Sequence, residues 1–313
     1  MLSFTLFHAS INFSSGIFFL TSGLFQSVEA NSFFEHQPQR IISTSPSITE
    51  MLFELGLQDR IVAVTDFCIY PKEACLLPSI GGVLNPNIEK IVSLDPDLII
   101  LQSDSAKVEK NIKSLGIPTF SIKVRTISDI FESINRLGKE LNCQEAAKKL
   151  LLLLKDKINA FKQKLVGQLP KKVLLLLADS SDPAHDLYAV GPGTFLNELL
   201  VLSGGKNILN NSKAQYPKLS KEYIIEQSPE IIIEAGPKSN LPQKEIDYKV
   251  EQWNRFPTIQ AVRDKRIYFI GADYILIPGP RLVKILENFV QVIHPDLSNS
   301  QTEKISFQGT VKP

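Results

Sequence analysis

The feature that most constrains the fold is an internal repeat, because two segments far apart in the chain match one another. The first is IEKIVSLDPDLII (Ile88–Ile100), and the second is KEYIIEQSPEIII (Lys221–Ile233). Glu89 of the first segment aligns with Glu222 of the second. Each half therefore presents a Glu at the start of a short helix, followed by a Pro-led, buried strand. Self-similarity of this kind indicates two related structural units.

One long helix-forming stretch, Cys143–Gln168, separates the two units. It is rich in Ala, Leu, Lys, Gln and Glu and has no Pro or Gly before Gly167, which marks its end. Asn142 is the predicted N-cap. The run Leu150–Leu154 is apolar on nearly all sides, so we expect the middle of the helix to be buried, and its charged neighbours exclude a membrane span. The stretch is either a core helix of one domain or a strut between two lobes.

The order of the predicted elements favours the strut. Predicted strands alternate with helices on both sides of it, which indicates βαβ units and parallel sheets. The sequence therefore predicts an α/β fold: two Rossmann-like parallel-sheet lobes joined by a single long α-helix. The predicted divisions are a signal peptide at 1–30, an N-terminal lobe at 31–142, the connecting helix at 143–168, a C-terminal lobe at 169–295 and a flexible tail at 296–313. Ligands of such sheets bind beyond the carboxyl ends of the strands, so a cleft between the lobes is the expected site.

The N-terminus resembles an export signal. Residues 1–28 contain no Asp, Glu, Lys or Arg, and Ile11–Phe25 is mostly apolar. Val28 and Ala30 supply small residues for cleavage after Ala30. An uncleaved membrane anchor is the alternative. No Cys follows the apolar run to accept a lipid, so we expect a freely diffusing protein of the periplasm.

The three cysteines do not predict a metal centre. Cys68 and Cys75 could close a short disulfide loop, with Cys143 left free, or they could be inert thiols. No His lies near Cys68 or Cys75 to complete a metal site. The net charge is only +1, and the Lys and Arg residues are spread along the chain, so the sequence indicates no basic patch for nucleic acid.

Catalysis is poorly supported, and we expect no catalytic residue. Of four His, only His185 lies in a loop at the end of a predicted strand, and an ordinary exposed His is the better interpretation. The sequence lacks a nucleophile elbow, a P-loop and an H-E-x-x-H motif. An enzyme built from two Rossmann-like lobes remains the alternative from another class. Trp253 is interpreted as a packing residue.

Aromatic residues in strand-end loops point to a large, flat, partly apolar ligand. Any single one could be a local core anchor, but together they would line both sides of the expected cleft. Apart from Arg281, we find no Arg in these loops, which argues against a small, highly charged ligand. The aromatic residues are Phe67, Tyr70, Tyr188, Tyr216 and Tyr274.

Five segments, in this order and spacing, carry a resemblance to a known family. They are RIISTSPSITEMLFELGLQDRIVAVTDFCIYP, IGGVLNPNIEKIVSLDPDLII, YAVGPGTFLNELLVLSGGKNIL, YPKLSKEYIIEQSPEIII and IPGPRLVKILENF. Across residues 40–295 the chain resembles the helical-backbone periplasmic binding proteins of ABC importers. The Tyr-Pro loop and the GGVLNPNIE segment are most similar to the cobalamin-binding branch.

The resemblance implies a non-enzymatic, monomeric protein without cofactor that delivers a ligand to an ABC permease and its ATPase at the inner membrane. It implies cobalamin or a related corrinoid as the ligand, and haem or a ferric siderophore as the alternative. Glu89 and Glu222 match the family's two permease-docking glutamates. The ligand-facing positions of the cobalamin branch fall near Phe67, Tyr70, Val83, Asn85, Tyr188, Tyr216 and Tyr274. Val83 and Tyr216 depart from that branch, which carries larger aromatic residues there.

Overall fold

A computed structural model describes residues 36–177, 187–239 and 241–297. The predicted signal peptide, His185 and residues 298–313 of the predicted tail lie outside these ranges. Pro295–Leu297 forms a short 3-10 turn, η3.

The N-terminal lobe is built on a four-stranded parallel sheet of order β2-β1-β3-β4. Its strands are short, and the central strands β1 and β3 are almost wholly buried because helices cover both faces, which explains their largely apolar sequences. The strands are β1 (Ile41–Ser43), β2 (Ile61–Ala63), β3 (Leu98–Gln102) and β4 (Thr119–Ile122). The α-helices are α1 (Pro46–Glu54), α2 (Ile88–Ser93), α3 (Ala106–Lys113) and α4 (Ile127–Glu140); η1 (Gln58–Arg60) and η2 (Lys72–Leu76) are 3-10 turns.

The C-terminal lobe repeats this topology with a sheet of order β10-β9-β5-β7, also parallel. In both lobes the first strand of the sheet lies between the second and the third, as expected for an internal repeat. The strands are β5 (Lys171–Leu177), β7 (Gly205–Asn207), β9 (Ile231–Gly236) and β10 (Ile267–Gly271), and β6 (Leu187–Tyr188) pairs with β8 (Lys218–Leu219) in a small antiparallel ribbon. The helices are α6 (Phe195–Leu202), α7 (Lys221–Gln227), α8 (Gln243–Asn254), α9 (Gln260–Arg263) and α10 (Leu282–Ile293).

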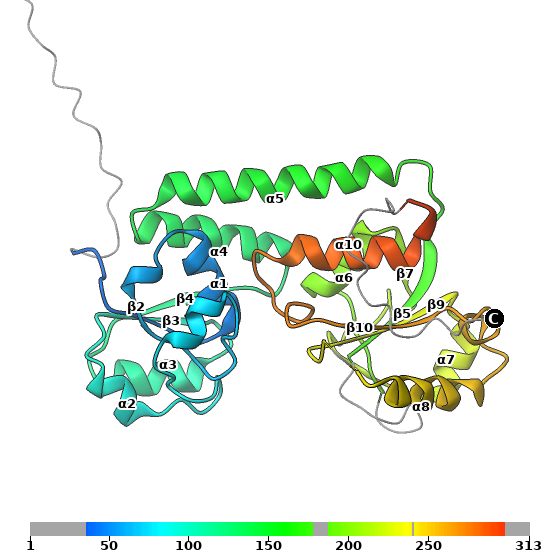
Figure 1. Cartoon of the computed structure of the whole chain (residues 1–313), viewed down its shortest axis with the longest axis horizontal. Helices are drawn as coiled ribbons and strands as arrows, with labels where there is room; N and C mark the ends of the chain where they lie inside the picture. Colours follow the sequence, from blue (N-terminus) through cyan, green and yellow to red (C-terminus); the bar gives the residue numbers. More distant parts are fainter. Residues whose placement is uncertain (1–35, 178–186, 240, 298–313) are drawn as a thin grey trace, which may run out of the picture. The chain divides into compact units, whose positions relative to one another are not determined.

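The connecting helix is α5 (Gln144–Lys164), which packs against α4 of the first lobe and α10 of the second (Figure 1). Its buried residues Ala147, Leu150, Leu154 and Ile158 form a single stripe. The predicted burial of the whole middle is wrong, because Leu152 and Leu153 are 54% and 49% exposed. A helix that lies on the surface of two lobes can bury only one face.

The predicted N-cap of α5 is also wrong. Cys143 occupies the N-cap position without a side-chain hydrogen bond, and Asn142 adopts a positive φ of 56° in the turn from α4. Asn is among the residues that tolerate this conformation, so Asn142 suits the turn rather than the cap. All three cysteines are free thiols, so the possible Cys68–Cys75 bridge is not formed.

Four elements of the second lobe were not predicted from the sequence: the short strands β6, β7 and β8, and the helix α8. The strand β7 has only three residues and begins with a Gly, which gives no apolar alternation to detect. In α8, Ile246, Val250 and Trp253 follow a helical spacing on the buried face. Trp253 is fully buried and donates a hydrogen bond from Nε1 to Glu234 Oε1 at 2.9 Å, which places it in the core as predicted.

Candidate binding cleft

A cavity of about 670 Å³ lies at the carboxyl ends of strands from both sheets, where the sequence predicts the ligand site. Gln102 to Asp104 lie at and beyond the end of β3, and Lys123 to Arg125 follow β4. The second lobe contributes Phe195 at the start of α6, Tyr216 in the loop after β7, and Leu276 to Pro278 after β10. Pro46, Ser47, Val83, Ile122, Asp129 and Gln215 complete the lining.

Two hydrogen bonds, each donated by a backbone N–H group, join the lobes beside this cleft. The backbone N–H of Phe195 donates to the carbonyl oxygen of Arg125 at 2.6 Å. The backbone N–H of Ile127 donates to Glu198 Oε2, also at 2.6 Å. The start of α4 and the start of α6 therefore meet directly, and this contact fixes the position of Phe195 in the cleft wall.

Two of the predicted ligand-facing residues, Val83 and Tyr216, line this cleft. Tyr216 is 45% exposed, and partial burial raises the pKa of its phenol, so the ring is neutral at physiological pH. Its face is free to receive an apolar surface, while the hydroxyl retains a donor and an acceptor. The roles of both residues in ligand binding stay predictions.

Tyr70 and Tyr274 lie instead around Arg281. The guanidinium carbon of Arg281 is 3.8 Å from the centroid of the Tyr70 ring and 5.3 Å from that of Tyr274. Asn288 Nδ2 also donates to the hydroxyl of Tyr274 at 3.1 Å. These contacts are cation–π and packing interactions, and neither Tyr is among the residues that line the cleft.

The remaining predicted positions do not line the cleft either. Phe67 is 61% exposed, and Asn85 is exposed in the loop before α2. Tyr188 lies in β6 with its side chain partly open to solvent. The structure therefore gathers two of the seven predicted residues into the described cavity.

Charged residues of the cleft were missed by the sequence analysis. Arg281 is not the only Arg in a strand-end loop, because Arg125 and its neighbour Lys123 follow β4 and line the cleft. The cleft is also lined by two residues of opposite charge, Asp104 and Asp129. Asp129 belongs to the capping box of α4, in which its Oδ2 accepts a hydrogen bond from the backbone N–H of Thr126. The sequence Lys-Val-Arg, which spans the end of a predicted strand, was the available signal.

Arg281 itself is buried between the lobes. Its Nε and Nη2 donate to the two carboxylate oxygens of Glu50 at 3.0 and 2.6 Å, and its Nη1 donates to Asp273 at 2.6 Å. Burial raises the pKa of Glu50, and the hydrogen bonds and charge of Arg281 offset part of this rise. The network connects α1 of the first lobe with the segment before α10 of the second.

The two predicted docking residues occupy equivalent, exposed positions. Glu89 and Glu222 are each the second residue of a short helix, α2 and α7. Asn87 and Ser220 cap these helices by accepting backbone hydrogen bonds from the third residue. Hydrogen bonds from its own backbone N–H and from Ser220 lower the pKa of Glu222, so it carries a negative charge at neutral pH.

Comparison with protein families decides the class of this protein. The model of the family described as periplasmic binding protein matches residues 41–274. The chain is a periplasmic binding protein. This family membership agrees with the predicted resemblance and implies an exported protein that binds a small-molecule ligand and serves a permease and an ATPase.

Relatives of this periplasmic binding protein are named as binding proteins. It is 30% identical over 268 residues to the uncharacterized ABC transporter substrate-binding lipoprotein YvrC of Bacillus subtilis, covering 83% of this chain and 81% of the relative. It is 27% identical over 261 residues to the vitamin B12-binding protein of Vibrio parahaemolyticus, covering 81% and 90% of the two chains. Both relatives are named as binding proteins, the first of them as the substrate-binding protein of an ABC transporter.

Solved structures share the fold. The periplasmic vitamin B12-binding protein BtuF of Vibrio cholerae superposes with a TM-score of 0.71 at 23% identity, over 84% of this chain and 99% of the other. A periplasmic haem-binding protein of Pseudomonas aeruginosa gives 0.72 at 21% identity, over 82% and 93%. The same two-lobed fold therefore serves different ligands.

Two further observations concern the described ranges of the periplasmic binding protein. None of their helices combines the length and apolar character needed to cross a bilayer. Nor do they bring three His, Cys, Asp or Glu side chains together in a group that could hold a metal ion.

Proposed function

We propose that the cleft binds cobalamin or a related corrinoid and that the protein delivers this ligand to an ABC importer. The observation that carries the proposal is the cleft between the lobes, where Val83, Phe195, Tyr216 and Leu276 provide apolar and aromatic surface. Its volume of about 670 Å³ lies within the range of small-molecule sites. The names of the vitamin B12-binding relatives support the choice of a corrinoid.

Haem or a ferric siderophore is the second candidate, and one specific observation favours it. Lys123 and Arg125 lie on the same wall of the cleft and would pair with the carboxylates or catecholates of such ligands. A corrinoid held mainly by apolar contact makes less use of these two cations. The two candidates therefore differ in how strongly salt should weaken binding.

Absorption spectra distinguish these ligands directly. The purified protein is mixed separately with cobalamin, haem and a ferric siderophore, and free ligand is removed by gel filtration. Cobalamin should co-elute with the protein in a one-to-one ratio. Co-elution of haem or siderophore without cobalamin would reject the corrinoid assignment.

The proposal assigns docking to Glu89 and Glu222. Each lobe would contribute one of these glutamates, and each glutamate would meet a basic residue on the permease, as the repeat suggests. Their side chains are exposed, and neither residue lines the cleft. Docking and ligand binding therefore use separate groups.

Export is proposed to use residues 1–30 as a signal peptide that is cleaved near Ala30, which releases a monomer without a lipid anchor. The name of the Bacillus subtilis relative contains the word lipoprotein, so the mass of the mature protein tests whether an acyl group is attached here. Intact-mass spectrometry of the secreted protein should give a chain that begins at Asn31. A retained leader or an added acyl mass would contradict this part of the proposal.

A further inference from the structure

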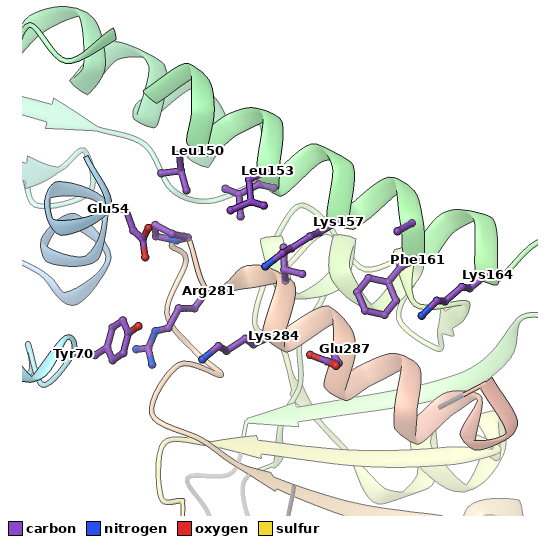
Figure 2. A pocket seen from close by; sticks show the side chains of 14 residues that line it. Glu54, Tyr70, Leu150, Leu153, Lys157, Phe161, Lys164, Arg281, Lys284 and Glu287 are labelled. Carbon is purple, nitrogen blue, oxygen red and sulfur yellow. The ribbon is translucent and has the colours of Figure 1, made fainter. Parts of the chain in front are cut away.

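A second cavity, of about 440 Å³, lies beside α5 and has no part in the proposed function (Figure 2). It is bounded by α5, by α10 with the segment before it, and by Glu54 and Tyr70 of the N-terminal lobe. Among the described residues, none that lines this cavity also lines the cleft. Its volume is within the range of small-molecule sites.

One side of this cavity is apolar. Leu150, Leu153 and Phe161 of α5 line it together with Val283 of α10. Leu153 is 49% exposed although its chemistry favours burial, and the Phe161 ring is half-buried. An apolar group bound here would cover surface that otherwise faces water.

The other side is predominantly basic. Lys157 and Lys164 of α5 and Lys284 of α10 line the cavity, against two acidic residues, Glu54 and Glu287. In Figure 2 the side chain of Lys157 extends from α5 toward α10, and the side chain of Lys284 extends toward Arg281. Within the described ranges, none of the three lysines has an ion pair; Lys164 and Lys284 lie 5.6 and 5.7 Å from the centroids of the Phe161 and Tyr274 rings.

Arg281 closes one end of the cavity and adds a buried donor. Its guanidinium has five N–H groups, of which three donate to Glu50 and Asp273. Its face packs on Tyr70, which also lines the cavity. The guanidinium thus keeps donor capacity next to the lysines while its own position is fixed.

We propose that this cavity binds an amphipathic carboxylate. The apolar chain would pack on Leu150, Leu153 and Phe161, and the carboxylate would lie near Lys157 and Lys284 at the end formed by Arg281. An alcohol of the same chain length lacks the charge, and an amphipathic cation would be repelled by the lysines. The ligand class follows from this pairing of an apolar wall with unpaired ammonium groups.

Calorimetry with sodium decanoate at low ionic strength tests the proposal on the full, folded chain. We expect saturable one-to-one binding, with weaker binding by 1-decanol and by decyltrimethylammonium. Lys157→Gln and Lys284→Gln should each weaken decanoate binding about two- to fivefold, since each removes one partly exposed charge contact. Leu153→Asp should abolish it, because a carboxylate would then occupy the apolar wall.

Two controls separate this site from others on the molecule. Lys162 belongs to α5 but lines a different cavity, beside α4 and α6, so Lys162→Gln should leave decanoate affinity unchanged. Tyr216→Ala alters the cleft and should also have no effect. The proposal is overturned if decanoate binding does not saturate, if 1-decanol binds equally well, or if Lys162→Gln or Tyr216→Ala weakens binding as much as Lys157→Gln.

Discussion

Arg281 and Glu50 lie 231 residues apart in the chain and form a bidentate ion pair across the two lobes. Their side chains are 7% and 2% exposed. Glu50 belongs to α1, whose first residues line the cleft and whose last residue, Glu54, lines the cavity beside α5. The ion pair is therefore a direct connection between the lobes, in addition to α5, and its Arg281 also lines the cavity beside α5.

Removing one partner of this pair should destabilise the protein strongly. Arg281→Met leaves the Glu50 carboxylate buried without its cation and should lower the free energy of unfolding by about 3–5 kcal/mol. The double variant Arg281→Met/Glu50→Leu removes both charges and should recover most of this loss. Denaturation with urea measures all three proteins, and a double variant as unstable as Arg281→Met would contradict the account.

The loss in Arg281→Met should also depend on pH. Burial, Asp273 and Glu54 raise the pKa of Glu50, and Arg281 opposes the rise. Without Arg281 the folded-state pKa is higher still, so folded Glu50 keeps its proton to a higher pH than in the unfolded chain. Stability then falls as pH rises through the folded-state pKa.

We therefore expect a small effect of Arg281→Met near pH 5 and a large one near pH 8, measured by urea denaturation at both values. Arg281→Met/Glu50→Gln is the matched control, because glutamine does not titrate at this position. It should show a much smaller difference between the two pH values. An equal loss at pH 5 and pH 8 in Arg281→Met would show that Glu50 is not responsible.

The close approach of α4 and α5 gives a third prediction. A Cβ atom on Gly138 would clash with the Cβ atom of Ala147, although Gly138 has ordinary helical geometry. Helix propensity alone predicts that Gly138→Ala adds about 1 kcal/mol of stability. The contact instead predicts a loss of about 1–3 kcal/mol through overpacking.

Thermal or urea denaturation of Gly138→Ala decides between these opposite signs. The double variant Gly138→Ala/Ala147→Gly restores the space and should regain part of the loss. A Gly138→Ala protein more stable than the parent would mean that α5 does not pack tightly on α4.

The alternation of elements and the internal repeat were sufficient to predict both lobes. Buried parallel strands such as β3 and β9 are continuous apolar runs, which are easily recognised. The connecting helix was located from its composition, since strong helix formers run through it without Pro or Gly until its end. Its burial was overestimated because the composition of Leu150–Leu154 does not show which face meets the lobes.

The site was less predictable because it depends on contacts between residues distant in sequence. Nothing local indicates that Glu50, inside a helix, is buried against Arg281, or that Tyr70 packs on the same guanidinium. Tyr216 could be assigned because it is an aromatic residue in a loop after a strand, whereas Val83 was assigned only through the resemblance to the cobalamin-binding branch. Arg125 follows such a strand as well and could have been assigned by the same reasoning.

Docking to the permease gives a fourth prediction. Glu89→Lys combined with Glu222→Lys places like charges against the proposed basic partners and should weaken association at least about tenfold. Transport in cells at limiting binding protein measures the effect, and purified protein should keep its ligand affinity. Glu145→Lys, an exposed acidic residue in the first turn of α5, is the matched control. Full transport by the Glu89/Glu222 double variant would exclude this docking mode.

The central claim is that a corrinoid binds in the cleft against Tyr216, and calorimetric titration of cobalamin into the parent protein and Tyr216→Ala tests it most directly. Truncation of a well-buried contact aromatic costs more than about 2 kcal/mol, so Tyr216→Ala should weaken binding about thirtyfold or more, with little dependence on salt. Tyr248→Ala is the matched control, because Tyr248 is also 45% exposed but lies in α8, outside the cleft lining. Equal affinities for all three proteins, or no binding of cobalamin by the parent, would contradict the account.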